Sequence, residues 1–261
     1  MSLPFTPGEF FAVFRDYNTA VWPLQVLFNA LAVGALGLVF APRRFSGRLI
    51  SAILALLWAW MGVVYHLVFF SQINKAANIF GILFILQGIL FLYFGAYRQL
   101  IKLEVRHDVS GVLGIIILLY ALIVYPIAGL FLGHVYPSSP TFGVPCPTVI
   151  FTFGILLFSQ YRVPWYMVMI PLLWSLIGLS AAITLSMPED FGLVVAGVVS
   201  AVFVLFLKPQ RSANAALAML ALAAAPSLAA GSITLKAPRA AMVLRSKVNR
   251  AARDVLDRHD F

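Results

Sequence analysis

Two histidines and the single cysteine are the residues of this sequence best suited to chemistry. His66 lies beside Tyr65 near the end of an apolar segment, and His134 and Cys146 lie in a proline-rich stretch near the middle of the chain. Imidazole and thiolate ligands together favour soft metals such as copper or zinc, so these residues suggest a metal-handling site. No local ligand spacing accompanies them, and the identity of any metal is open. Structural histidines and a small buried cysteine are the alternative.

A second set of candidates is neutral and polar. Gln25 and Asn29 lie one helical turn apart, so they share a face of a helix. Gln87 is near the middle of another apolar segment, and Ser175 lies in a third. A polar group in hydrocarbon is costly unless it is hydrogen-bonded, so we expect all four to face the interior of a helix bundle. They predict either interhelical hydrogen bonds or a pocket or path for a small polar solute.

The composition indicates the class of protein that must hold these residues in place. The 261-residue chain is 62% hydrophobic and 10% charged, whereas soluble domains carry about 25% charged residues. An all-α, polytopic membrane helix bundle is therefore predicted. One cysteine excludes a disulfide framework. The sequence contains no nucleic-acid motif and no phosphate-binding glycine loop, so we expect neither nucleic-acid binding nor a cofactor, and it leaves open whether the chain is an enzyme.

Seven apolar segments approach the roughly 20 residues that a membrane-spanning helix needs. The fifth has only 13 clearly apolar residues after the proline-rich stretch 133–148, so we expect it to be broken or to include part of that stretch. Asp, Glu, Lys and Arg are absent from all seven, which argues against a proton pump or an ion-coupled carrier. Glu189 and Asp190 precede the seventh segment, where we interpret them as helix-capping residues. The segments are 21–40, 49–70, 77–97, 112–132, 141–160, 165–187 and 191–207.

Shorter elements are predicted on both sides of this transmembrane domain, which we assign to residues 21–208. In residues 1–20, Thr6, Pro7 and Glu9 form a typical helix start. We expect a short helix in the membrane interface, or else an extension of the first span. Residues 209–261 hold an alanine-rich part, with 212–230 as a candidate eighth span. They end in a basic amphipathic tail, which we expect to bind anionic lipid.

The loops predict an orientation and the segments suggest a repeat. Lys and Arg are concentrated in the loops after segments 1, 3, 5 and 7, so the positive-inside rule puts the N-terminus and the 133–148 stretch outside. The motifs LLWAWMG at 56–62 and LLWSLIG at 172–178 suggest that segments 1–3 and 5–7 form a parallel repeat, with segment 4 as the linker. Parallel repeats of this kind are common in transporters.

Four segments carry a resemblance to a known family: FFAVFRDYNTAVWP at 10–23, MGVVYHLVFF at 61–70, PTFGVPCPTVIFTFG at 140–154 and PEDFGL at 188–193. They resemble a bacterial integral-membrane family labelled domain of unknown function 6064, over about residues 3–207. The resemblance implies a multi-pass protein of the bacterial inner membrane. It implies no activity, substrate or catalytic residue. The chain after Arg211 does not resemble the family.

Three functions are compatible with these features. The first is a small-solute transporter or channel-like protein whose path lies between the two helix triples. The second is a membrane sensor or scaffold that binds a protein partner through the 133–148 stretch or the basic tail. The third is a metal-handling protein that uses His66, His134 and Cys146.

Overall fold

The computed structural model of the protein describes residues 4–209. This part is all-α, is 75% helical and contains no strands. The predicted eighth span at 212–230 and the basic tail lie outside the described residues. The α-helices in chain order are α1 (Pro7–Val21), α2 (Leu24–Phe40), α3 (Ser46–Trp60), α4 (Ala77–Leu90), α5 (Val109–Leu119), α6 (Tyr125–Phe131), α7 (Pro145–Leu156), α8 (Met169–Thr184) and α9 (Phe191–Ala201).

Several α-helices continue without a break into π-helical or 3-10 turns. These turns lengthen α3, α4, α5 and α9, and they join α5 to α6 as one long helix. Two further 3-10 turns precede α8 and α9. The turns are η1 (Met61–Phe69), η2 (Phe70–Gln72), η3 (Phe91–Tyr97), η4 (Tyr120–Val124), η5 (Trp165–Met167), η6 (Pro188–Asp190) and η7 (Val202–Leu207).

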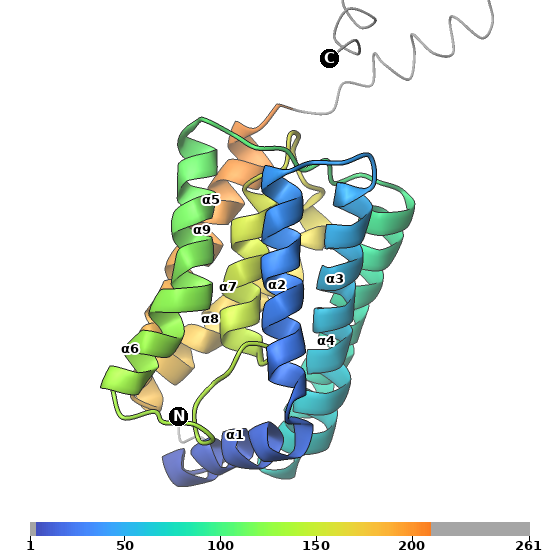
Figure 1. Cartoon of the computed structure of the whole chain (residues 1–261). Helices are drawn as coiled ribbons and strands as arrows, with labels where there is room; N and C mark the ends of the chain where they lie inside the picture. Colours follow the sequence, from blue (N-terminus) through green and yellow to red (C-terminus); the bar gives the residue numbers. More distant parts are fainter. Residues whose placement is uncertain (1–3, 210–261) are drawn as a thin grey trace, which may run out of the picture. The chain divides into compact units, whose positions relative to one another are not determined.

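The N-terminal helix begins at the predicted residues. Glu9 donates its main-chain N–H to the Thr6 hydroxyl at 3.3 Å, and its carboxylate accepts from the Thr6 main-chain N–H at 2.7 Å. This reciprocal capping box satisfies two main-chain donors that the helix leaves free. The chain then bends by 87° between α1 and α2, at Pro23, which has no N–H to continue the helix. As a result, α1 lies across the end of the bundle (Figure 1) and is not a straight extension of the first span.

Four helices in the described residues are long and apolar enough to cross a membrane. They are Ser46–Gln72, Ala77–Tyr97, Val109–Phe131 and Pro188–Leu207, and the bent pair α1 and α2 makes a fifth if it is counted as one span. The prediction of seven spans is therefore wrong by the measure of helix length. At 1.5 Å per residue, the 12 residues of α7 and the 16 of α8 fall short of a hydrocarbon core of about 30 Å.

The short helix α7 is nearly all buried, which explains how it can be so short. It packs against α5, α8 and α9, and it runs through the middle of the bundle behind α2 (Figure 1). Trp58 on α3 donates its indole N–H to the Thr152 hydroxyl of α7 at 3.0 Å. A helix enclosed in this way meets protein along its length, so its ends can lie at membrane depth without facing lipid.

We predict that Gly143→Ala destabilises the fold. Gly143 has a φ of +104°, and a Cβ there would lie 2.4 Å from Cδ2 of Phe28. Strain at such a position costs of order 1–3 kcal/mol, so the thermal midpoint of the detergent-solubilised protein should fall by several degrees. Gly37→Ala is the matched control because a Cβ there meets nothing within 4 Å, and alanine is the better helix former. Equal midpoints for the two variants would contradict the prediction.

Candidate functional site

The proline-rich stretch between α6 and α7 is held in place by Asn18, a buried residue of α1. The Asn18 side-chain amide donates to the carbonyl oxygens of Pro137 at 2.7 Å and Ser139 at 2.8 Å. Its side-chain oxygen accepts from the Thr141 hydroxyl at 2.7 Å. Buried main-chain carbonyls need such partners where no helix supplies them. Asn18 thus allows an irregular segment to pack inside an apolar protein.

Tyr17, the neighbour of Asn18, makes the next contacts with this stretch. Its hydroxyl donates to the carbonyl oxygen of Gly143 at 3.2 Å and accepts from the indole N–H of Trp60 at 2.8 Å. Gln25, at the start of α2, donates to the main-chain oxygen of Asn18 at 2.9 Å. Together these bonds fix α1, α2 and the irregular stretch against one another.

The first cavity, here called the polar cavity, has a volume of about 510 Å³ and lies between α2, the helix of α5 and α6, and the proline-rich stretch. Gln25 and Asn29 line it from α2, and Tyr125 lines it from α6. The proline-rich stretch contributes further hydrogen-bonding side chains, those of His134, Tyr136, Ser139 and Thr141.

Two adjacent carboxylates lie behind the wall of the polar cavity. Asp190, almost fully buried, accepts hydrogen bonds from the Tyr125 hydroxyl at 2.7 Å and the Cys146 thiol at 3.4 Å. Glu189, also buried, has one carboxylate oxygen 2.6 Å from Nδ1 of His134. Its other oxygen is buried without a hydrogen-bond partner. We call Glu189 and Asp190 the acid pair.

The acid pair does lie in the first helical turn, as the sequence predicts, but the interpretation of its side chains as capping groups is not met. Neither side chain makes a capping hydrogen bond at the start of α9. The helix begins in a 3-10 turn at Pro188, and both carboxylates contact residues of α6, α7 or the loop that follows α6. The span therefore includes two acidic residues that the predicted limit of 191 left outside.

The second cavity, here called the aromatic cavity, has a volume of about 220 Å³. Cys146, which donates to Asp190, forms part of its wall, so the acid pair lies between the two cavities. Most of the remaining wall is apolar, and its rings come from α1 and the residues just before it, the end of the α3 helix, α4 and α8. These rings are Phe5, Phe10, Phe14, Tyr65, Phe70, Phe80 and Trp174.

The four neutral polar candidates lie in different surroundings. Gln25 and Asn29 both line the polar cavity, as residues of one helix face. Gln87 is buried and donates to the carbonyl oxygen of Met167 at 2.9 Å, an interhelical hydrogen bond. Ser175 bonds to the carbonyl oxygen of Leu172 in its own helix at 2.7 Å. The structure therefore brings the first two together and places the other two among structural hydrogen bonds.

The candidates for the metal-handling hypothesis are also separated. His66 is fully buried, neither of its ring nitrogens has a hydrogen-bond partner, and its ring packs on Phe84 and Trp174. His134 and Cys146 contact different carboxylates of the acid pair. Within residues 4–209, no group of three or more His, Cys, Asp and Glu side chains is placed to hold a metal ion. The described residues thus offer no site for this hypothesis.

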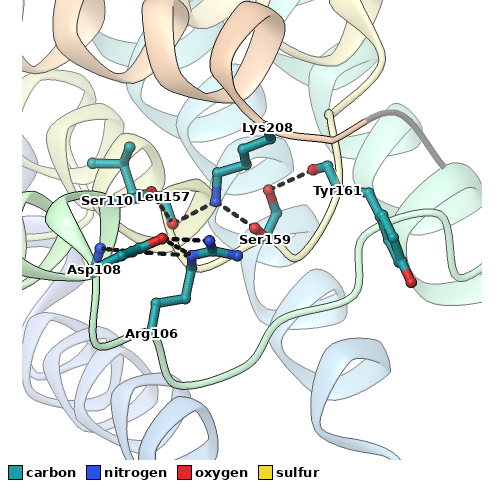
Figure 2. A network of polar contacts seen from close by, with 8 residues as sticks. Arg106, Asp108, Ser110, Leu157, Ser159, Tyr161 and Lys208 are labelled. Atoms are coloured by element: carbon teal, nitrogen blue, oxygen red, sulfur yellow. Dashed lines mark hydrogen bonds and ion pairs between the residues drawn. The ribbon is translucent and has the colours of Figure 1, made fainter.

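A second polar cluster surrounds Lys208, at the opposite end of α7 from the acid pair (Figure 2). Lys208 is 3% exposed, and its ammonium donates to the carbonyl oxygens of Leu157 at 2.7 Å and of Ser159. Next to it, Arg106 forms an ion pair with Asp108. Burial lowers the pKa of Lys208 to about 7, and the positive charge of Arg106 acts in the same direction. The hydrogen bond from Arg106 lowers the pKa of Asp108 to about 2.

Sequence patterns missed several of these residues. Asn18 and Tyr125 lie in helices without any local signal, because their partners are far away in the chain. Asp190 and Lys208 do carry a signal, since they flank the apolar segment 191–207 at its two edges. Charges at the ends of a span are common, however, and only their burial distinguishes these two.

Comparison with known proteins gives a family and nothing further. A family model described as a family of unknown function, DUF6064, matches residues 8–231. The expectation that the chain after Arg211 departs from the family is therefore wrong as far as residue 231. No curated protein and no solved structure matches the chain.

We predict that Lys208 reacts with amine-directed reagents near neutral pH. It lines a cavity of about 280 Å³ through which a small reagent such as acetic anhydride can reach it. Only the uncharged amine reacts, so labelling followed by mass spectrometry should show a midpoint near pH 7. Arg106→Gln should move this midpoint to higher pH, because it removes a positive charge and releases Asp108 to pair with Lys208. Arg98→Gln, on the same loop, is the control. An unchanged midpoint in Arg106→Gln would contradict the prediction.

Proposed function

The chain belongs to the family of unknown function DUF6064, and from that premise we propose that it is a multi-pass protein of the bacterial inner membrane that binds and transports a small polar solute. Its helices include four that are long and apolar enough to cross a membrane, which supports the membrane part of this proposal. The family assigns no substrate, so the chemistry of the solute has to be argued from the cavities.

The polar cavity is the observation that carries the proposal. Its volume of about 510 Å³ lies within the range of about 300–1,000 Å³ typical of small-molecule sites. Gln25, Asn29 and Thr141 offer it amide and hydroxyl groups, and Tyr125 and His134 add groups that are backed by the acid pair. Hydrogen-bonding groups gathered around a cavity of an otherwise apolar protein fit a ligand that is itself polar.

The acid pair also makes ion-coupled transport compatible with the proposal. The lack of charged residues inside the spans argued against ion coupling at the level of sequence. With Glu189 and Asp190 buried within the helical span Pro188–Leu207, that objection no longer applies. Ionisable groups buried in membrane helices commonly mark the path of a proton, an ion or a substrate. We place the acid pair beside the solute site in this proposal.

The path of the solute rests on predictions from sequence. The proposed orientation puts the N-terminus, and with it the polar cavity, at the outer face. The parallel repeat of 21–97 and 141–207 would place the path between two helix triples, with the polar cavity beside the linker segment, whose Tyr125 lines it. The alternative of a sensor or scaffold draws partly on the basic tail, which lies outside the described residues.

We predict that Val26→Trp slows solute permeation. Val26 lines the polar cavity, and an indole there would fill part of it. Val33 is the matched control, since it lies on the same helix with a similar exposure, 60% against 58%, and does not line the cavity. Stopped-flow light scattering of proteoliposomes can measure reswelling in urea, glycerol and erythritol.

The wild-type protein should speed reswelling by at least one of these solutes over protein-free vesicles. Val26→Trp should reduce that gain at least fivefold, and Val33→Trp should leave it within twofold. Reswelling rates equal to those of protein-free vesicles for all three solutes would count against transport. Equal slowing by both variants would show that the polar cavity is not the route.

A further inference from the structure

The aromatic cavity has a character of its own, distinct from that of the polar cavity. Its rings come from several helices, and perpendicular ring pairs occur both within one helix and between helices. Phe10 and Phe14 meet edge to face at 4.9 Å and 74°, and Phe80 and Trp174 do so at 5.5 Å and 79°. Such pairs are a favoured packing of aromatic side chains. The cavity is therefore walled by several aromatic rings that pack against one another.

The size of the cavity limits what it can hold. Its volume of about 220 Å³ is below the range of about 300–1,000 Å³ found for drug-sized ligands. Its few polar side chains include those of Asn74, Cys146 and Ser180. A solute that needs many hydrogen bonds would be poorly satisfied there. The occupant should thus be small and weakly hydrated.

The electrostatics of the surroundings favour a positive charge. Among the described residues that line the aromatic cavity, none is basic. Behind its wall, Asp190 is buried and accepts only neutral donors, the Tyr125 hydroxyl and the Cys146 thiol. Burying a charged carboxylate without a cationic partner costs desolvation free energy that nothing repays. The ion pairs of residues 4–209 give the acid pair a single basic partner, His134, and it contacts Glu189.

We propose that the aromatic cavity binds a small organic cation of the methylated ammonium class, with its charge facing the rings and the Asp190 carboxylate behind Cys146. Aromatic rings attract such cations through the negative potential of their faces, and a methylated ammonium is weakly hydrated enough to enter an apolar space. The carboxylate supplies the charge that the rings alone do not. This site is separate from the polar cavity and does not depend on the transport proposed above.

A pair of isosteres tests the role of charge directly. Choline and 3,3-dimethyl-1-butanol have nearly the same shape, but the second has carbon in place of the charged nitrogen. Isothermal titration calorimetry of the purified full-length protein in detergent should show saturable binding of choline, with the alcohol at least tenfold weaker. Equal affinity for both would mean that the cavity is merely apolar. No binding of choline or of tetramethylammonium would also overturn the proposal.

Matched variants test the location. Phe80 and Phe94 lie on the same continuous helix, Ala77–Tyr97, and both are half-buried, but only Phe80 lines the aromatic cavity. Phe80→Leu should weaken choline binding at least threefold, and Phe94→Leu should leave it unchanged. Asp190→Asn should weaken choline and have little effect on the alcohol, with the thermal midpoint checked for folding. Equal effects of Phe80→Leu and Phe94→Leu would place any binding elsewhere.

The variant Val26→Trp separates this proposal from the transport proposal. Val26 belongs to the polar cavity alone, so choline should bind Val26→Trp as it binds the wild-type protein. Loss of choline binding in that variant would assign the cation to the polar cavity and overturn the site proposed here.

Discussion

The buried helix α7 has a buried carboxylate beside its first turn and a buried ammonium beside its last. Both groups belong to residues at the two ends of one neighbouring helix, the one formed by α9 and η7. Asp190 precedes α9 and bonds to Cys146 in the first turn of α7. Lys208 follows η7 and donates to the carbonyl oxygens of Leu157 and Ser159, just past the last turn of α7. A negative charge near the start of a helix and a positive charge near its end are both stabilised by the helix dipole.

This arrangement explains how a 12-residue helix can stand at the centre of a membrane-type bundle. The carbonyl groups at the end of α7 have no partner within the helix, and lipid would offer them none. Lys208 and the hydroxyl of Ser110, which bonds to Leu157 at 2.7 Å, supply those partners from α5 and the end of η7. Because the contacts are with protein, α7 does not have to reach the membrane surface.

The other end of the bundle is organised by the segment that leads into α7. Asn18 satisfies the carbonyl groups of Pro137 and Ser139, and Tyr17 that of Gly143. These bonds draw α1 across the bundle end (Figure 1), where Phe10 and Phe14 of α1 close one side of the aromatic cavity. The irregular segment itself lines the polar cavity. The elements held by this polar connection thus border both cavities, and Asp190 bonds to a wall residue of each.

Composition and apolar run length were enough to predict an all-α membrane-type protein, and the capping residues Thr6 and Glu9 marked the start of α1. These features are local, since each depends on residues within about one helical turn or on an average over the chain. The pairing of Gln25 and Asn29 on one helix face was predictable for the same reason. The lengths of α7 and α8 were less predictable. Apolar residues continue beyond both ends of each helix, and composition does not tell which of them are helical.

The tertiary structure alone decided which polar residues meet. Asn18 and Ser139 are 121 residues apart in the chain, and Tyr125 and Asp190 are 65 apart. No periodicity within a helix reports on such distances. The same carboxylate can cap a helix in water or be buried against a tyrosine, and the difference lies in which helix packs beside it. For that reason the sequence predicted helix-capping residues at Glu189 and Asp190, and the fold buries both carboxylates against distant residues.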